Sequence, residues 1–166
     1  VNFAQLTQRD GSFLVAREKD EDFSFEKLRG KTIIGGRIGG MPEMTLEYVL
    51  RKHGLEPGKD VNVRTDIQFD VMAGAFTGGE GDYVTLFEPV ASNLEKEDRA
   101  YVVASIGAEG GNVPYTSYSA TSEFLEKNPE LVESFTRAVY KGMLWVQDSS
   151  SEEVAKALVE HFPDAD

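Results

Sequence analysis

The chain of 166 residues contains no cysteine. This absence excludes disulfides, thiolate metal sites and a cysteine nucleophile, but it leaves the cellular compartment open. The sequence also lacks the roughly 18 consecutive apolar residues of a membrane span and a charged-then-apolar secretion signal at its start. Its two histidines, His53 and His161, do not lie at metal-ligand spacing from carboxylates. We therefore expect no metal, no cofactor and no catalytic residue.

Positive charge is also scarce. Lys and Arg number 17 against 29 Asp and Glu, which gives a formal net charge of −12. Such a charge repels nucleic acid and anionic lipid surfaces, so a nucleic-acid partner is not expected. It says little about a small ligand, because helix N-termini or a single arginine can make a pocket locally positive.

The composition is that of a globular protein, with 40% hydrophobic residues and 16 glycines that indicate many turns. The first residue is Val1 rather than methionine, and the last five, 162–166, look like the opening of another helix. We interpret the sequence as a fragment of a longer protein.

The hydrophobic pattern predicts an α/β fold, with helices flanking a mainly parallel sheet. A β-branched run at 32–36 leads through glycines into a helix that Pro42 opens and Gly54 ends, and a strand at 61–65 completes a βαβ unit. Further strands are expected at 1–6, 12–17, 83–87, 101–106 and 115–120, and a loop at 107–113. Helices are expected at 69–76, in a short stretch that ends at about 97, in another that starts at 124–125, and from Pro129 onward. The serines at 149–151 are expected to cap a last helix that runs through Phe162.

The strongest local signal is the glycine-rich turn between the strand at 32–36 and the helix that follows it. A strand that enters a helix through glycines leaves free backbone N–H groups aimed at one spot, which attracts anionic ligand groups. The spacing matches neither a phosphate-binding P-loop nor a dinucleotide fingerprint. Two interpretations remain open: Gly39 and Gly40 contact a ligand beyond the carboxyl ends of the strands, or the glycines only turn the chain.

A second signal is the sequence Phe87-Glu88-Pro89, which places a carboxylate where a strand ends. Glu88 is expected at the same sheet edge as Gly40. There it either accepts hydrogen bonds from a ligand amine, amide or aminopyrimidine, or it braces loop N–H groups. Polar and aromatic side chains at other strand ends and connectors suit hydrogen bonding and stacking in a cleft: Thr7, Gln8, Phe69, Asp70, Tyr115 and Thr116.

These motifs follow one another in a familiar order. The segment 28–33 resembles an "L-x-G-K-x-I" opening, the Gly39-Gly40 loop and Phe87-Glu88-Pro89 follow, and 123–132 is similar to an "F-L-E-K-N-P-E-L-V" helix start. Over nearly its whole length the chain resembles the extracytoplasmic solute-binding proteins for nitrate, sulfonates, taurine and pyrimidine precursors of thiamine.

The resemblance implies a type II periplasmic-binding fold, in which two lobes close on a ligand by a hinge. Residues 28–112 would then form one lobe. Residues 1–27 would end the other lobe and make the first hinge crossing, and residues 113–166 would make the second crossing and return to it. The opening strands, with a signal or lipid anchor, would precede Val1.

The resemblance also implies a function without chemistry. Such a protein captures a small polar or anionic solute, sulfonate, nitrate-like or pyrimidine-type, in an interlobe cleft and delivers it to ABC permease subunits. It works outside the cytoplasm, in the periplasm or as a surface lipoprotein. Met41 stands where sulfonate binders often have a small hydroxyl residue, which favours a pyrimidine-like solute. The positions that line the cleft in the family correspond here to Gly39, Gly40, Met41, Glu88, Thr7, Gln8, Tyr115 and Thr116.

Two other functions share this fold. Eukaryotic pyrimidine-precursor synthases resemble the same family, but they carry a cysteine-rich iron-binding motif and an active-site histidine, and this chain has no cysteine. A ligand-sensing domain of a regulator would use the same pocket with a different output.

Overall fold

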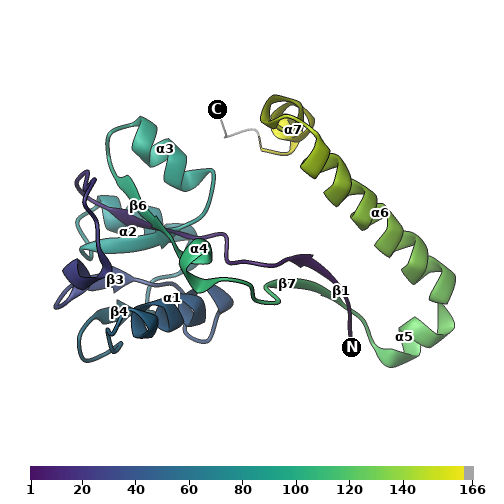
Figure 1. Cartoon of the computed structure of the whole chain (residues 1–166), viewed down its shortest axis with the longest axis horizontal. Coiled ribbons are helices and arrows are strands. Elements are labelled where there is room, and N and C mark those ends of the chain that lie inside the picture. Colours follow the sequence, from purple (N-terminus) through teal and green to yellow (C-terminus); the bar gives the residue numbers. More distant parts are fainter. Residues whose placement is uncertain (163–166) are drawn as a thin grey trace. The chain divides into compact units, whose positions relative to one another are not determined.

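The computed structural model describes residues 1–162 of the chain. It divides into two compact units, which Figure 1 shows as ribbons. One unit is the continuous segment Arg9–Val113, and the other combines Val1–Gln8 with the chain from Pro114 onward. The helix opening predicted at 162–166 lies, from residue 163 on, outside the described residues.

A five-stranded sheet forms the centre of the Arg9–Val113 unit, in the order β4 (Asn62–Arg64), β3 (Thr32–Ile34), β5 (Tyr83–Leu86), β2 (Phe13–Ala16) and β6 (Tyr101–Ser105). Strand β3 pairs in parallel with β4 and β5, while β2 is antiparallel to both β5 and β6. Every strand except β2 therefore runs in one direction, which confirms the predicted α/β class with a mainly parallel sheet.

The predicted βαβ unit is present. Helix α1 (Met41–Lys52) joins β3 to β4, Pro42 lies in its first turn, and Gly54 follows its end with a positive φ of 74°. The other helices of this unit are η1 (Phe25–Leu28), η2 (Phe69–Val71), α2 (Met72–Thr77), α3 (Val90–Lys96) and α4 (Ile106–Gly110), of which η1 and η2 are 3-10 helices.

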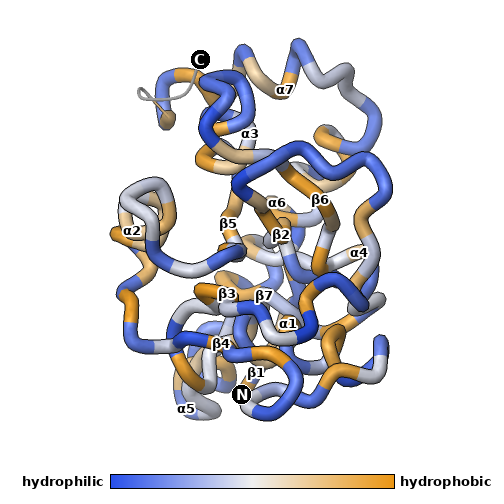
Figure 2. Tube along the Cα trace, turned by 90° about the vertical axis from the view of Figure 1, so that its left-hand side faces the viewer, coloured by the Kyte–Doolittle hydropathy of each residue, from blue (hydrophilic) through white to orange (hydrophobic). Residues whose placement is uncertain are grey.

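Both faces of the sheet are covered, because neighbouring strand residues point to opposite sides. Ile33 and Leu14 pack on the side of α1, whereas Ile34 and Val15 pack on the side of α2 and α3. Figure 2 colours β3 and β6 largely as hydrophobic; β3 is mostly buried, while β6 at the edge of the sheet is half-buried. The core therefore holds the carboxyl ends of the parallel strands at one edge of the sheet.

The structure differs from the predicted loop at 107–113. Residues 106–110 form α4, in which the Ser105 hydroxyl accepts a hydrogen bond from the Ala108 N–H at 3.2 Å. Gly107 is buried in this helix, and a Cβ there would lie 1.9 Å from the Asp10 carbonyl oxygen. The three glycines of this stretch suggested a loop, but here glycine allows a close approach between two backbone segments.

This compact unit contains residues 28–112 of the expected lobe. The unit begins at Arg9 because β2, at 13–16, lies between β5 and β6 in the middle of the sheet. The chain therefore passes from one unit to the other at residues 8–9 and 113–114. That the two units belong to two hinged lobes stays a prediction.

The second unit contains a short ribbon and a series of helices. Strand β1 (Asn2–Thr7) pairs antiparallel with β7 (Thr116–Ser119), and α5 (Ser122–Lys127), α6 (Pro129–Asp148), α7 (Ser151–Leu158) and the 3-10 helix η3 (Val159–His161) follow. Ser150 and Glu153 form the capping box that starts α7, in agreement with the predicted serine cap.

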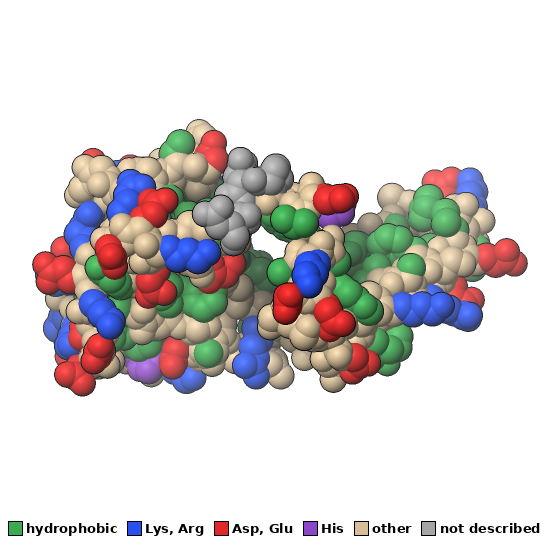
Figure 3. Space-filling model, turned by 90° about the horizontal axis from the view of Figure 1, so that it is seen from above, with side chains coloured by type: hydrophobic (Ala, Val, Ile, Leu, Met, Phe, Trp, Pro, Cys, Tyr) green, Lys and Arg blue, Asp and Glu red, His purple; other side chains and the backbone are tan. Residues whose placement is uncertain are grey.

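Several apolar side chains of α6 are exposed, including Leu131, Tyr140 and Trp145, and Figure 3 shows hydrophobic side chains at the surface of this unit.

Across residues 1–162, the chain has no helix whose length and hydropathy would let it span a bilayer.

Candidate functional site

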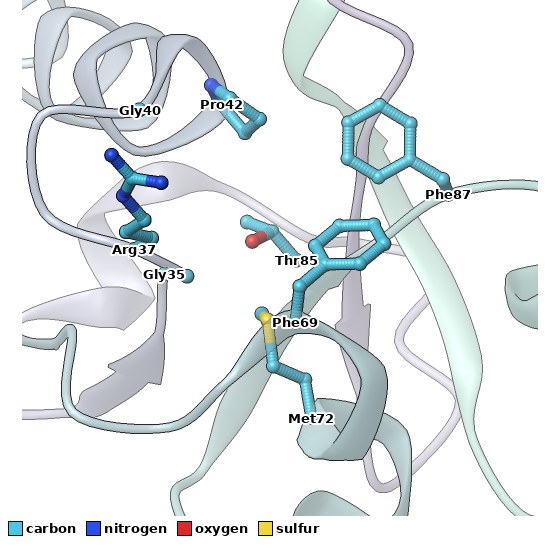
Figure 4. Close-up of a pocket in the computed structure, with 9 residues that line it drawn as sticks. Gly35, Arg37, Gly40, Pro42, Phe69, Met72, Thr85 and Phe87 are labelled. Carbon is cyan, nitrogen blue, oxygen red and sulfur yellow. The ribbon is translucent and has the colours of Figure 1, made fainter.

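A small hollow lies at the carboxyl edge of the sheet, within the Arg9–Val113 unit. Its volume is about 130 Å³. It is bounded by the ends of β3 and β5, the start of α1 and the segment at η2, and Figure 4 shows its lining: Gly35, Gly36, Arg37, Gly40, Pro42, Phe69, Met72, Thr85 and Phe87. Ligands of open α/β sheets bind at this edge, so the hollow is the candidate site of the unit.

The glycine loop forms one side of the hollow. The Gly40 N–H donates to the Arg37 carbonyl oxygen at 3.0 Å and closes a tight turn, in which Gly39 has a φ of 71°. Gly35 has another role, because a Cβ there would lie 2.6 Å from Val63 Cγ1 and 3.1 Å from Leu46 Cδ2. This glycine lets α1 lie close against the sheet.

Glu43 occupies the place where the sequence suggested an anionic ligand. Its carboxylate, which is 5% exposed, accepts a hydrogen bond from the Gly39 N–H at 3.0 Å. Burial raises the pKa of the Glu43 carboxyl, and the bond from Gly39 opposes that shift. The chain therefore satisfies this loop amide with its own carboxylate in the first turn of α1.

Aromatic and apolar side chains form the opposite wall. The rings of Phe69 and Phe87 lie 5.6 Å apart between centroids with an interplanar angle of 56°. Phe69 is 60% exposed, while Met72 beneath it is buried. The Phe87 ring packs closely against Gly11, because a Cβ at residue 11 would lie 3.3 Å from that ring.

Two polar side chains line the hollow, Arg37 and Thr85. The Thr85 hydroxyl lies 3.4 Å from the Ile34 carbonyl oxygen and is buried. Arg37 is exposed, and its guanidinium lies beside Gly40 and Pro42 in Figure 4, across from the two rings.

Arg37 differs from the other arginines in its partners. Each of the others donates side-chain hydrogen bonds to described residues, either to carboxylates or to amide and carbonyl oxygens: Arg9, Arg17, Arg29, Arg51, Arg64, Arg99 and Arg137. Within residues 1–162, the Arg37 side chain makes neither a hydrogen bond nor an ion pair. A cation is therefore available at the hollow in a chain of net charge −12.

The residues predicted as ligand contacts do not all meet at this hollow. Gly40 and Phe69 line it, and Gly39 adjoins Gly40 in the loop. Met41 begins α1, and Asp70 is exposed on η2, but neither belongs to the lining.

The Glu88 carboxylate is occupied within its own segment. It accepts hydrogen bonds from the Ser92 N–H at 3.0 Å and the Ser92 hydroxyl at 2.8 Å. These bonds brace the start of α3, which was one of the two roles considered for Glu88.

The remaining predicted residues lie in the other unit. The Thr7 hydroxyl accepts a hydrogen bond from the Thr116 N–H at 3.0 Å, and the Tyr115 N–H donates to the Thr7 carbonyl oxygen at 3.3 Å. Gln8 is exposed at the end of the same ribbon. A ligand role for this group stays a prediction.

The sequence reasoning missed Arg37, Thr85 and Met72 as lining residues. Arg37 is the one cation inside the glycine loop, so its position was a usable signal. Nothing in the local sequence around Thr85 or Met72 marks them, because their places depend on how the strands and α2 are packed together.

Residues 1–152 match the family model described as NMT1/THI5 like. This match covers most of the chain, in agreement with the order of motifs noted in the sequence. The chain belongs to the NMT1/THI5-like family.

The relatives of this family member are described as binding proteins. It is 48% identical over all 166 residues to a protein of Bacillus subtilis (strain 168) described as "Putative binding protein YtlA", of which it covers 50%. The periplasmic aliphatic sulphonate binding protein SsuA from Escherichia coli has a TM-score of 0.74 at 18% identity, over 95% of this chain and 52% of SsuA.

A third relative is the alkanesulfonate-binding protein SsuA from Xanthomonas axonopodis pv. citri bound to MOPS. Its TM-score is 0.67 at 17% identity, over 84% of this chain and 47% of that protein. These likenesses confirm the type II periplasmic-binding fold, and this NMT1/THI5-like chain spans about half the length of the relatives it matches.

Proposed function

We propose that the protein containing this chain is the solute-binding component of an ABC importer. It captures a small polar or anionic organic solute, and the hollow beside the glycine loop is part of its binding site. The observation that carries this proposal is the lining itself, in which the polar side chains are those of Arg37 and Thr85. A guanidinium and a hydroxyl among apolar walls recognise a ligand by charge and hydrogen bonding.

The lining of the hollow contains neither a histidine nor a carboxylate. General acid–base chemistry requires a titrating side chain such as histidine or a carboxylate within hydrogen-bond reach of the substrate. The residues that line the hollow include neither. His53, in the same unit, contacts Glu109 at 2.8 Å and stacks on Phe25 with 4.0 Å between ring centroids, so it has a structural role. This arrangement favours capture over catalysis.

The family membership supports the rest of the proposal. Structural neighbours are described as periplasmic sulfonate-binding proteins, one of them as part of a "putative sulfonate ABC transporter", which supports our placing this protein outside the cytoplasm, in the periplasm or as a surface lipoprotein. The permease subunits are its expected partners. We further assign its two compact units to the two lobes of a hinged binding protein.

A solute screen on the complete protein tests this function. A ligand that binds only the folded state raises the melting temperature by mass action, in proportion to the logarithm of its concentration above Kd. We expect at least one solute among sulfonates, nitrate, carboxylates and pyrimidines to raise the midpoint and to give a saturable calorimetric titration. If the whole panel leaves both measurements unchanged, solute capture is refuted.

A further inference from the structure

We propose that the hollow holds one aromatic six-membered ring and that Arg37 pairs with an anionic substituent of that ring, a carboxylate or a sulfonate. This inference rests on the proposed capture function and names the class of solute. It is carried by three features of the hollow: its size, its aromatic wall and its unpaired cation.

The size of the hollow matches one ring. An apolar cavity of about 150 Å³ in a protein interior accommodates benzene, and the hollow here measures about 130 Å³ and is open on one side. Complete sites for small molecules are larger, on the order of 300 Å³ or more. The hollow therefore holds one ring-sized part of a solute, whose other atoms lie outside it.

The wall formed by Phe69, Phe87 and Met72 suits a ring better than an alkyl chain. Aromatic rings pair in offset or tilted arrangements, and the thioether of methionine makes favourable contacts with ring edges. Phe69 is 60% exposed beside the buried Met72, so an apolar face is open to solvent at the hollow. A flat ring would cover that face.

The charges at the hollow place the acidic group of the solute at Arg37. The Gly39 N–H already donates to the Glu43 carboxylate, so an anion at that amide would have to displace a buried carboxylate. Arg37 lies on the same side of the hollow and pairs with none of residues 1–162. Its planar guanidinium matches a carboxylate or sulfonate with two parallel hydrogen bonds.

Four probe molecules separate the ring from the charge in calorimetry on the complete protein. Benzoate and benzenesulfonate carry both features, benzamide keeps the ring without the charge, and ethanesulfonate keeps the charge without the ring. We expect benzoate or benzenesulfonate to bind most tightly, with benzamide and ethanesulfonate each weaker by about tenfold, since a hydrogen bond to a charged group and a buried ring each contribute on that scale.

Two variants test the residues. Arg37→Gln is expected to weaken the aromatic anions by about tenfold and to leave benzamide unchanged. Phe69→Leu keeps an apolar side chain but is expected to weaken all ring probes by about fivefold, with ethanesulfonate unaffected. Arg99→Gln is the matched control, because it removes the same charge from an exposed arginine that pairs with Glu97 and does not line the hollow.

The outcomes distinguish this inference from the proposed function. Ethanesulfonate binding as tightly as benzenesulfonate, equal losses in Arg37→Gln and Arg99→Gln, or no binding of any of the four probes would each overturn the aromatic-anion assignment. In each case the broader solute screen still decides whether the protein captures a solute of another class.

Discussion

Gly35 offers the most direct test of how the hollow is built. Replacing it with alanine adds one methyl group, which would lie 2.6 Å from Val63 Cγ1 and 3.1 Å from Leu46 Cδ2. Leu46 is fully buried, and Val63 packs against the same core cluster, so neither side chain moves freely. Overpacking of this kind costs about 1–3 kcal/mol, and the lower entropy of the unfolded alanine variant offsets about 0.4–1 kcal/mol.

We therefore expect Gly35→Ala to lower the free energy of unfolding by about 1–2 kcal/mol, measured by urea denaturation of the complete protein. Val63→Ala, which removes two partly buried methyl groups, costs about 1 kcal/mol alone. Combining the two removes the closer contact, with Val63 Cγ1, and leaves the one with Leu46, so the double variant should lose less than the sum of the single losses by about 1 kcal/mol.

Gly74→Ala is the matched control for this series. Gly74 lies in α2 with no atom within 4 Å of an added Cβ, so alanine there should stabilise the helix by about 0.5–1 kcal/mol. Strictly additive losses for Gly35→Ala and Val63→Ala would show that the close approach of α1 to the sheet is not what requires glycine at residue 35.

Two further predictions concern carboxylates near the hollow. Glu88→Ala should lower the free energy of unfolding by about 1 kcal/mol, because the bonds to Ser92 are lost, and it should change solute affinity little. Denaturation and calorimetry measure the two effects. Unchanged stability with a large loss of affinity would instead place Glu88 on the ligand. Burial raises the pKa of Glu43 above its value in the unfolded chain, so this group should lower the stability as the pH rises from its unfolded pKa through its folded pKa. Glu43→Gln removes that dependence, which denaturation midpoints of both proteins over roughly pH 4 to 7, around the titration range of a glutamate, would show. Parallel pH profiles for the two proteins would contradict this assignment.

Local sequence was enough to predict the elements whose signals are continuous in the chain. The β-branched run at 32–34, the proline that opens α1 and Gly54 after its end predict the βαβ unit, because each residue acts on its own backbone. The serine cap of α7 was predictable for the same reason. The glycine loop was also correctly placed at the sheet edge, next to the hollow.

What the sequence did not predict depends on contacts between distant segments. A four-residue strand at 13–16 does not reveal that it lies between β5 and β6 in the middle of the sheet. The glycines after Ile106 suggested a loop, but buried Gly107 serves a backbone approach to Asp10 instead. The sequence left Glu88 with two possible roles and gave no signal for Glu43, because their partners, Ser92 and Gly39, appear only in three dimensions.

The glycine loop and the side chains around it contribute to the site in different ways. Glycine at residue 35 lets α1 approach the sheet, and Glu43 satisfies the Gly39 amide, so the loop shapes the hollow more than it offers N–H groups to a ligand. In the proposed binding site we therefore assign charge and shape selectivity to Arg37 and Phe69, which are exposed and carry little of the core. Variants of Gly35 should therefore change stability and affinity together, whereas variants of Arg37 should change affinity alone.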